Sequence, residues 1–248
     1  MARDTQDIEL VMLVSPITFR HPAVLAKMAV TIDRMSGGRF LLGVGTGWME
    51  LEHEVFGIPY PESGVRFDMF EEALGYLTAA FDPTFPGFEG LHYSLRSFPL
   101  SPAPTGKIPI VIGGTGAHRT PRLAGTFADE YNVYPGADIA DRIARFKAAA
   151  SAAGRDPDDI RLSSSGQVIA AATEAEFEVL MAERAEAAQM TRDELEAYFE
   201  ARQTPRGTFE QVRAQLDGLE EHGVSRFYFQ GIFAPGDMEQ LFDGLGIA

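Results

Sequence analysis

The sequence alternates short apolar runs with longer segments of helical periodicity, and this alternation constrains the fold more than any other feature. The runs predicted to be buried strands are 8–14, 40–44, 108–112, 130–134, 160–170 and 226–232. The segments predicted to be helical are 22–35, 66–81, 117–128, 138–153, 174–202 and 208–222. Strands that alternate with helices are typical of βα units in a parallel sheet or barrel. We therefore expect one α/β domain over residues 1–248 with six core parallel strands.

The segment 82–106 departs from this alternation. It is rich in proline, which cannot donate a hydrogen bond to a neighbouring strand and favours turns and sheet edges. Within it, 93–98 has the character of a short strand. We predict an insertion between two βα units at this point of the chain.

Charge and cysteine content narrow the classes of partner. The chain has 21 basic and 36 acidic residues, and this formal net charge of −15 disfavours binding to nucleic acid or to an anionic membrane. The absence of cysteine excludes disulfides, thiolate metal sites and cysteine nucleophiles. No run of 18 apolar residues is present to span a membrane. We expect a cytoplasmic protein that acts on a small molecule.

A glycine-rich turn, Ile112-Gly113-Gly114-Thr115-Gly116, ends the predicted strand 108–112. Glycines let the backbone approach an anion closely, and the helix that follows directs free N–H groups at it. His118, Arg119 and Arg122 add cationic side chains at the start of that helix. The pattern is typical of a phosphate site. A tight turn before a solvated basic helix start explains it equally well, because it matches neither GxGxxG nor the Walker motif.

A second glycine-rich strand end, Gly43 to Gly47, leads into an acidic stretch that contains Trp48, the only tryptophan of the chain. This loop can position a planar ring and supply an acid or a base. The alternating glutamates of the stretch 50–54 also suit a solvated helix start. The pairs of His53 with Glu52 and with Glu54 lack the i, i+3 or i, i+4 spacing that ligands on a helix need, so we predict no metal site. His53 can equally be a packing residue.

The other polar motifs favour structural roles. His21 precedes Pro22, which suits the first position of a helix, and this pair predicts a helix cap. The small residues 163–166 form part of a predicted strand and contain no Gly-x-Ser-x-Gly elbow. A hydrolase triad therefore has little support.

Several motifs occur in a fixed order along the chain. They are 15–28, 33–39 (Asp-Arg-Met-Ser-Gly-Gly-Arg), 43–48 (Gly-Val-Gly-Thr-Gly-Trp), 56–59, 66–68, 71–74, 109–114 (Pro-Ile-Val-Ile-Gly-Gly), and Ala128 and Asp129 with Asn132. With these motifs the chain resembles the luciferase-like monooxygenase family, and most of all its branch of coenzyme F420-dependent oxidoreductases. The resemblance covers residues 8–245.

The resemblance implies a TIM-type (β/α)8 barrel that is truncated at its N-terminus to strands three to eight and carries the insertion near 82–106. It implies that coenzyme F420 or FMN binds at the carboxyl ends of the strands and transfers hydride. The implied cofactor-binding residues are Val14 and Ser15 in the turn after the first strand, Gly45 and Thr46 at the next strand end, Gly113, Gly114 and Thr115 at the phosphate, and Asn132 at the following strand end.

Two departures from the family pattern concern catalysis. The first two βα units of the family barrel, roughly 60 residues that normally carry an Asp-His pair, have no counterpart here. Some members also place an acid after the strand that corresponds to 40–44, where this chain has Gly47 and Trp48. Glu50 is the remaining candidate for a general acid.

Six strands cannot close a barrel as eight do, which leaves the apolar runs 8–14 and 226–232 as sheet edges. We expect one of three remedies for these edges. The chain begins inside a longer coding sequence, or it self-associates as a homo-oligomer such as a dimer, or its strands pair in a rearranged order.

Two functions remain open at this point. The first is an F420- or flavin-dependent oxidoreductase or monooxygenase with a small organic substrate, F420 being preferred. The second is a truncated, catalytically impaired homologue that only binds the cofactor, or a fragment. The net charge gives no attraction for the polyglutamate tail of F420, so selectivity for it would rest on Arg20, Arg119 and Arg122, whose other role is solubility.

Overall fold

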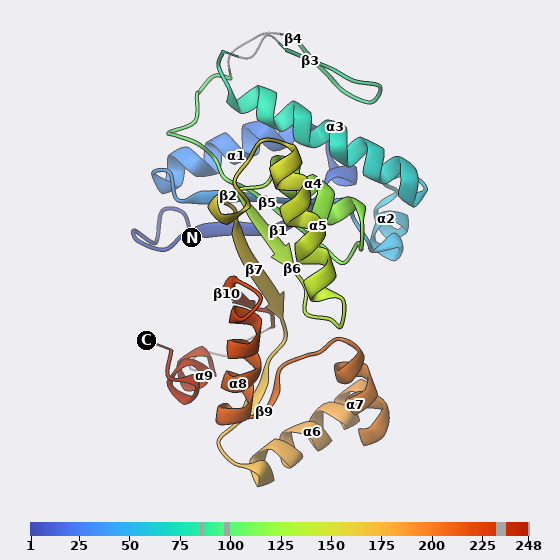
Figure 1. Ribbon diagram of the computed structural model, residues 1–248, viewed down its shortest axis with the longest axis vertical. Helices are drawn as coiled ribbons and strands as arrows, with labels where there is room; N and C mark the ends of the chain where they lie inside the picture. Colours follow the sequence, from blue (N-terminus) through green and yellow to red (C-terminus); the bar gives the residue numbers. More distant parts are fainter. Residues whose placement is uncertain (85–86, 97–99, 232–236, 248) are drawn as a thin grey trace. The chain divides into compact units, whose positions relative to one another are not determined.

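A computed structural model of the protein describes residues 1–84, 87–96, 100–231 and 237–247 (Figure 1). The chain forms two compact units. The first consists of Met1–Tyr131 and Arg145–Ile160, and the second of Asn132–Ala144 and Arg161–Ala248. The single domain over 1–248 stays a prediction.

The described residues form an α/β fold, as the alternating sequence predicted. The strands are β1 (Leu10–Pro16), β2 (Phe40–Gly45), β3 (Gly87–Glu89), β4 (Ser94–Arg96), β5 (Ile110–Gly114), β6 (Glu130–Val133), β7 (Arg161–Gly166), β8 (Ile169–Ala171), β9 (Arg206–Thr208) and β10 (Val224–Phe229). The helices are α1 (Pro22–Ser36), α2 (Glu50–Phe56), α3 (Ser63–Phe81), α4 (Arg119–Phe127), α5 (Ile139–Ala152), α6 (Glu174–Ala188), α7 (Arg192–Ala201), α8 (Phe209–Glu220) and α9 (Asp237–Leu245). No described helix has the length and apolar character needed to cross a membrane.

In the first unit the parallel strands follow the order β1-β2-β5, and β6 begins beside β5. Every residue of β2 is buried, because this apolar strand has a neighbour on both sides and is covered on both faces. In β1 only Ser15 is buried, and the other six residues are half-buried. The strand order ends at β1, as the sequence predicted for this apolar run.

The end of β1 differs from the sequence prediction. Val14 to Pro16 were expected in a turn, but they continue the strand, and Pro16 pairs with Gly45. The register of β1 against β2 shifts between Met12 and Ser15, and the Leu13–Val14 peptide bond is cis. A periodicity argument cannot detect this irregularity, because the run stays apolar through it.

Helix α1 is defined at both ends by residues that the sequence motif contains. His21 is the N-cap, its Nδ1 accepts a hydrogen bond from the Ala23 N–H at 3.1 Å, and Pro22 follows at the first helical position. This confirms the predicted cap. Gly37 ends the helix in the left-handed conformation with φ of 69°. Leu25 and Val30 are among the side chains that α1 buries, and α3 lies beside it (Figure 1).

The predicted insertion contains the antiparallel hairpin of β3 and β4. The Glu72 carboxylate of α3 accepts hydrogen bonds from three consecutive backbone N–H groups of the hairpin loop, those of Leu91, His92 and Tyr93, at 2.9, 2.7 and 3.1 Å. This contact fastens the hairpin to α3. The predicted strand 93–98 is described only to residue 96, because 97 and 98 lie outside the described residues.

In the second unit β7 lies between the end of β6 and β10, and β7 and β10 are parallel. The prediction of one strand over 160–170 is wrong. Strand β7 ends at Gly166, and β8 pairs instead with β9 in a separate two-stranded parallel sheet. The predicted helical stretch 174–202 is two helices, because Gln189 is left-handed with φ of 55° and Thr191 starts α7 with a capping box. Position 232 of the predicted last strand lies outside the described residues.

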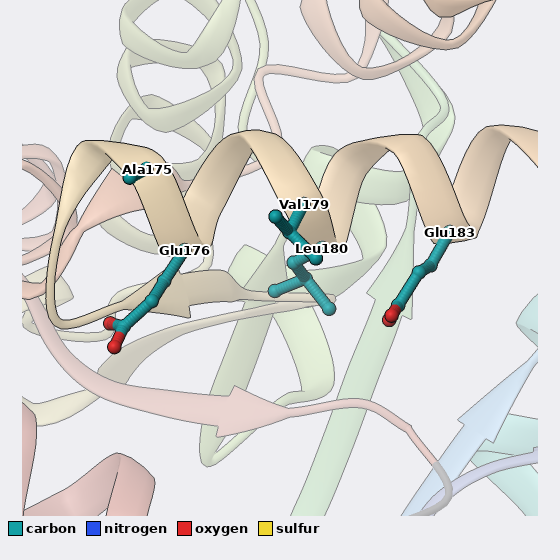
Figure 2. A pocket seen from close by; sticks show the side chains of 5 residues that line it. All are labelled: Ala175, Glu176, Val179, Leu180 and Glu183. Carbon is teal, nitrogen blue, oxygen red and sulfur yellow. The ribbon is translucent and has the colours of Figure 1, made fainter.

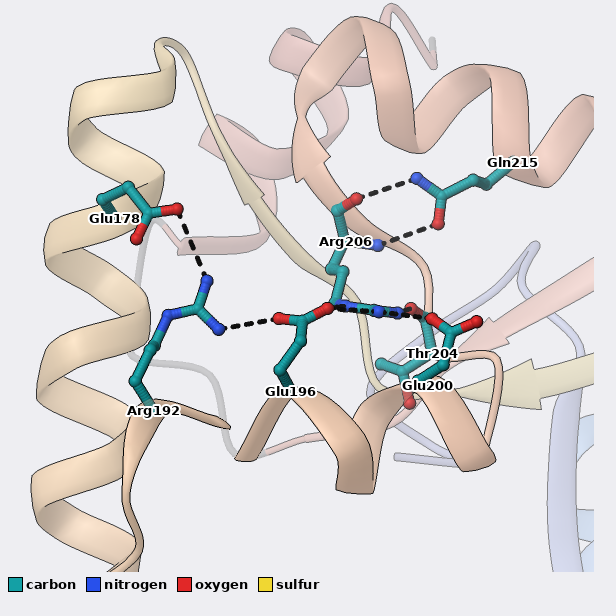
Figure 3. Close-up of polar contacts among 7 residues, drawn as sticks. All are labelled: Glu178, Arg192, Glu196, Glu200, Thr204, Arg206 and Gln215. Atoms are coloured by element: carbon teal, nitrogen blue, oxygen red, sulfur yellow. Dashed lines mark hydrogen bonds and ion pairs between the residues drawn. The ribbon is translucent and has the colours of Figure 1, made fainter. Parts of the chain in front are cut away.

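Helices α6 and α7 pack on β8 around a small apolar core of their own, formed by Ile169, Ala171, Phe177, Met181, Ala185, Leu195 and Phe199. A polar network lies beside this core (Figure 3). Arg206 binds Glu196 through Nε at 2.7 Å, Glu200 through Nη2 at 2.6 Å and the Thr204 carbonyl at 3.0 Å. Arg192 binds Glu196 from the other side at 2.7 Å.

Candidate functional site

The carboxyl ends of β1, β2 and β5 meet in the first unit, and they bring three predicted site residues together. A Cβ atom on Gly45 would lie 2.9 Å from Cγ2 of Val14 and 3.6 Å from the carbonyl oxygen of Gly113. A side chain at Gly45 would therefore collide with Val14. Binding sites of parallel α/β folds lie at this end of the strands.

Ser15 lies next to this junction and has an unusual environment for a hydroxyl group. Its side chain is buried, and among the described residues its Oγ has no hydrogen-bond partner. A buried polar atom without a partner costs free energy, which a polar atom of a ligand would offset. Ser15 is thus the predicted site residue whose environment fits a ligand best.

The turn between β5 and α4 is built on glycines in strained or closely packed positions. Gly114 has φ of +153°, which L side chains rarely adopt, and a Cβ on Gly116 would lie 2.5 Å from Oγ1 of the buried Thr120. Thr115 is exposed, and the N-cap residue His118 makes no side-chain cap. The turn can therefore offer backbone N–H groups and a helix N-terminus to an anion.

The two arginines of α4 are engaged by carboxylates of α3. Arg122 makes a bidentate pair with Glu71, at 2.9 and 2.5 Å, and Arg119 binds Asp68 at 2.5 Å. The hydrogen bond from Arg122 is the largest of the effects that lower the pKa of Glu71. Arg20, the third arginine of the proposed basic rim, places Nη1 3.4 Å from the Met28 sulfur. Most of the positive charge expected near the turn is therefore already paired.

Glu50, the candidate general acid, is the exposed first residue of α2. A carboxylate at this position is favoured by the helix dipole, which supports the structural alternative. Nothing in its surroundings tests a catalytic role, which stays a prediction. Trp48, two residues earlier, is 80% exposed.

His53 is a packing residue, which was one of the two alternatives for it. It is 1% exposed, and its ring nitrogens lie 2.7 Å from the Thr18 Oγ1 and 2.7 Å from the Met49 carbonyl oxygen. Sequence analysis missed Thr18, because a bond between side chains 35 positions apart leaves no local pattern. No group of three or more acidic or histidine residues in the described ranges is placed to hold a metal ion.

Asn132 lies in a fully buried polar cluster of the second unit. Its amide donates to the Ser163 hydroxyl at 3.0 Å and accepts from the Ser165 hydroxyl at 2.9 Å. Ser164 donates to the Val133 carbonyl on the neighbouring strand at 2.7 Å. These bonds link β6 to β7 and give the serine-rich segment a structural role. The role of Asn132 in cofactor binding stays a prediction.

A pocket of about 360 Å³ lies along α6 (Figure 2). Its described lining consists of side chains from this one helix: Ala175, Glu176, Val179, Leu180 and Glu183. None of the predicted site residues is among them. Two carboxylates beside aliphatic side chains are also typical of an exposed helix face, so we assign no chemistry to this pocket.

The sequence profile of a protein family described as luciferase-like monooxygenase matches residues 1–245. The chain belongs to this family. Among curated luciferase-like relatives, an F420-dependent glucose-6-phosphate dehydrogenase of Microbacterium testaceum is 37% identical over 122 residues, which are 49% of this chain and 36% of that protein. A pyrimidine monooxygenase RutA of Allorhizobium ampelinum is 30% identical over 164 residues, 63% of this chain and 44% of that protein. The chain thus matches between a third and a half of the length of these relatives.

The luciferase-like fold is also found in solved structures. An F420-dependent secondary alcohol dehydrogenase, solved with an F420-acetone adduct, superposes with a TM-score of 0.79 over 98% of this chain and 81% of that one, at 18% identity. This likeness supports the TIM-barrel-like α/β fold class with six core parallel strands that the sequence predicted.

Proposed function

We propose that this protein is an oxidoreductase that binds coenzyme F420, or alternatively FMN, at the carboxyl ends of β1, β2 and β5. The observation that carries the proposal is the junction of Val14, Gly45 and Gly113 beside the buried Ser15 hydroxyl, which lacks a partner. When bound, either cofactor supplies hydride transfer with a small organic substrate.

The residues of the first unit fit such a cofactor in three ways. Gly45 lets the ends of β1, β2 and β5 pack closely at the proposed ring site, and Ser15 offers a hydroxyl to a polar ring atom. Gly113, Gly114 and Thr115, followed by α4, offer N–H groups to a phosphate. Thr46, half-buried at the end of β2, completes the proposed contacts.

F420 remains the preferred cofactor, because the relative that is 37% identical is named as F420-dependent. The paired state of Arg119 and Arg122 weakens the proposed attraction for a polyglutamate tail. In the part of the chain that the structure describes, Arg20 is then the arginine of the proposed rim that pairs with no carboxylate. We further propose a homodimer in the cytoplasm, without nucleic-acid or membrane partners; the lack of cysteine is in keeping with this location.

Cofactor binding without turnover is the second candidate function. It is favoured by the exposed position of Glu50, since a general acid works best where its surroundings hold its geometry. The two candidates differ in whether a bound cofactor reacts.

The rate at which the chain reoxidises a reduced cofactor distinguishes the oxidoreductase from a protein that only binds the cofactor. The chain is mixed without oxygen with F420H2 or FMNH2, and a panel of small carbonyl, quinone and nitro compounds is added while the absorbance of the cofactor is followed. Multiple turnovers with one cofactor support the oxidoreductase, and binding without turnover supports the second candidate. Glu50→Gln tests the acid, with Glu54→Gln on the same helix as the matched control. An equal rate for both variants excludes Glu50.

A further inference from the structure

The buried imidazole of His53 bridges the segments that follow β1 and β2. Its partner on one side is Thr18, in the short 3-10 turn Ile17–Phe19 directly after β1. Its partner on the other side is the carbonyl oxygen of Met49, in the loop that leads from β2 to α2. Both contacts measure 2.7 Å, and the ring is 1% exposed. One side chain thus ties together two segments that begin at the proposed cofactor site.

The hydrogen-bond chemistry assigns the tautomer of this ring. A carbonyl oxygen only accepts, so Nδ1 must carry the proton and donate to Met49. In the neutral ring Nε2 is then an acceptor, and the Thr18 hydroxyl donates to it. Both nitrogens are used, which holds the ring at two ends.

Aromatic contacts hold the ring from its sides. The ring centroids of Phe19 and Tyr60 lie 4.9 and 4.6 Å from that of His53. The Tyr60 hydroxyl donates to the Trp48 carbonyl at 3.0 Å, and the guanidinium of Arg66 lies 3.8 Å from the Tyr60 ring centroid. The loop after β2 is thus held at Trp48 and at Met49.

The loop passes this cluster closely, and its backbone conformation at position 47 favours glycine. Gly47 has φ of +81°, and a Cβ atom there would lie 3.0 Å from the Thr18 Oγ1 and 3.5 Å from Cε1 of His53. Gly47 is two residues from Gly45, which belongs to the proposed site. A change at Thr18 or His53 therefore reaches Gly45 and Thr46 through a short and tightly packed stretch of backbone.

We infer that His53 is a positioning residue: through Thr18 and Met49 it fixes the end of β2 against the turn after β1, in the arrangement that the cofactor needs. This inference rests on the proposed cofactor site. His53 itself does not touch the cofactor, and it acts through the backbone of residues 45–49.

Thr18→Val tests the inference with little change in shape, because it replaces the hydroxyl with a methyl group of similar size. Thr31→Val is the matched control, since the exposed Thr31 hydroxyl bonds only the Lys27 carbonyl of its own helix, at 2.8 Å. Binding of F420 and of FMN is titrated for each variant. The fluorescence anisotropy of Trp48, the only tryptophan, reports the mobility of the loop without any cofactor.

We expect Thr18→Val to weaken cofactor binding about threefold to tenfold, the effect of one lost hydrogen bond, and to lower the anisotropy of Trp48. Thr31→Val should change neither quantity. His53→Phe should weaken cofactor binding at least as much as Thr18→Val. The double variant should bind no more weakly than His53→Phe alone, because the two residues act as one pair.

The failures of the inference and of the proposed function are distinguishable. A wild-type chain that binds neither cofactor contradicts the proposed function. A wild-type chain that binds, with Thr18→Val binding equally well, overturns the inference. An unchanged anisotropy of Trp48 in Thr18→Val also overturns it, whether or not a cofactor binds.

Discussion

The carbonyl oxygen of Met12 lies where a side chain on Gly43 would have to be placed. This close approach occurs where the register of β1 against β2 shifts, between Met12 and Ser15. Gly43 is fully within the buried strand β2, so neither backbone has room to move away.

Gly43→Ala should therefore lower the free energy of unfolding by about 3 kcal/mol or more, since overpacking a buried strand against backbone has no easy relaxation. The measurement is a urea titration of both proteins. Gly218→Ala is the control: Gly218 lies in α8 with no atom within 4 Å of its Cβ position, so the change should stabilise by about 0.5–1 kcal/mol. Equal stabilities for the two variants would contradict the described packing.

Gly45→Ala should affect binding more than folding. The new methyl group would meet the Val14 side chain at 2.9 Å, and this side chain can shift where a backbone cannot. The shift would change the junction of the three strand ends at the proposed cofactor site. We expect the dissociation constant for the cofactor to rise at least tenfold, by about 1.4 kcal/mol. Gly64→Ala is the control, because its Cβ position faces open space, and it should leave cofactor binding unchanged. If Gly45→Ala binds the cofactor as tightly as the wild type, this junction is not part of the site.

Glu72→Gln should loosen the β3–β4 hairpin in a pH-dependent way. Burial raises the pKa of the Glu72 carboxyl, but hydrogen bonds from three backbone N–H groups outweigh it and hold the pKa below the ordinary value of 4.5. The carboxylate therefore stabilises the fold above pH 4.5, and this contribution is lost as the pH falls through the lowered pKa. A glutamine turns an N–H donor toward the same backbone donors.

The expected loss for Glu72→Gln at pH 7 is about 1 kcal/mol, limited by solvent screening, and it should shrink as the pH falls below 4.5. Hydrogen exchange of the Leu91, His92 and Tyr93 amides at several pH values measures it. Glu89→Gln, at an exposed position of the same hairpin, is the control. A loss that is equal at pH 7 and pH 3.5 would rule out the carboxylate as its cause.

Arg206→Met should destabilise the second unit. The Arg206 side chain is 14% exposed and separates the carboxylates of Glu196 and Glu200, which would face each other without it (Figure 3). The loss in the free energy of unfolding should lie between that for an exposed and that for a buried ion pair, about 1–3 kcal/mol. Thermal denaturation at low and at high salt measures this loss. Arg184→Met on the exposed face of α6 should cost less than about 0.5 kcal/mol. A similar loss of stability in Arg206→Met and Arg184→Met would show that the polar network of Figure 3 contributes little to the stability of this unit.

The six core strands were predictable because short strand-like runs alternate along the chain with segments of helical periodicity. The break after Gly166 was not, because Val168 and Ile169 continue the apolar character while β8 leaves β7 and pairs with β9. Helix α9, which follows the last predicted strand, was also not predicted.

For the site, the family motifs indicated Val14, Gly45 and Gly113, and the structure brings these three together. The bond between Thr18 and His53 was beyond sequence analysis, because the fold alone brings two distant segments into contact. The same is true of the carboxylates that pair with Arg119 and Arg122: the sequence shows the arginines at a helix start, but not that α3 lies beside them.

The measurement that tests the proposed cofactor site most directly is a titration of the full chain with F420 and, separately, with FMN, followed by the absorbance and fluorescence of each chromophore. A site at the ends of β1, β2 and β5 predicts a saturable spectral change with at least one of them, weakened at least tenfold in Gly45→Ala and unaltered in Gly64→Ala. No spectral change with either cofactor would contradict the proposed site.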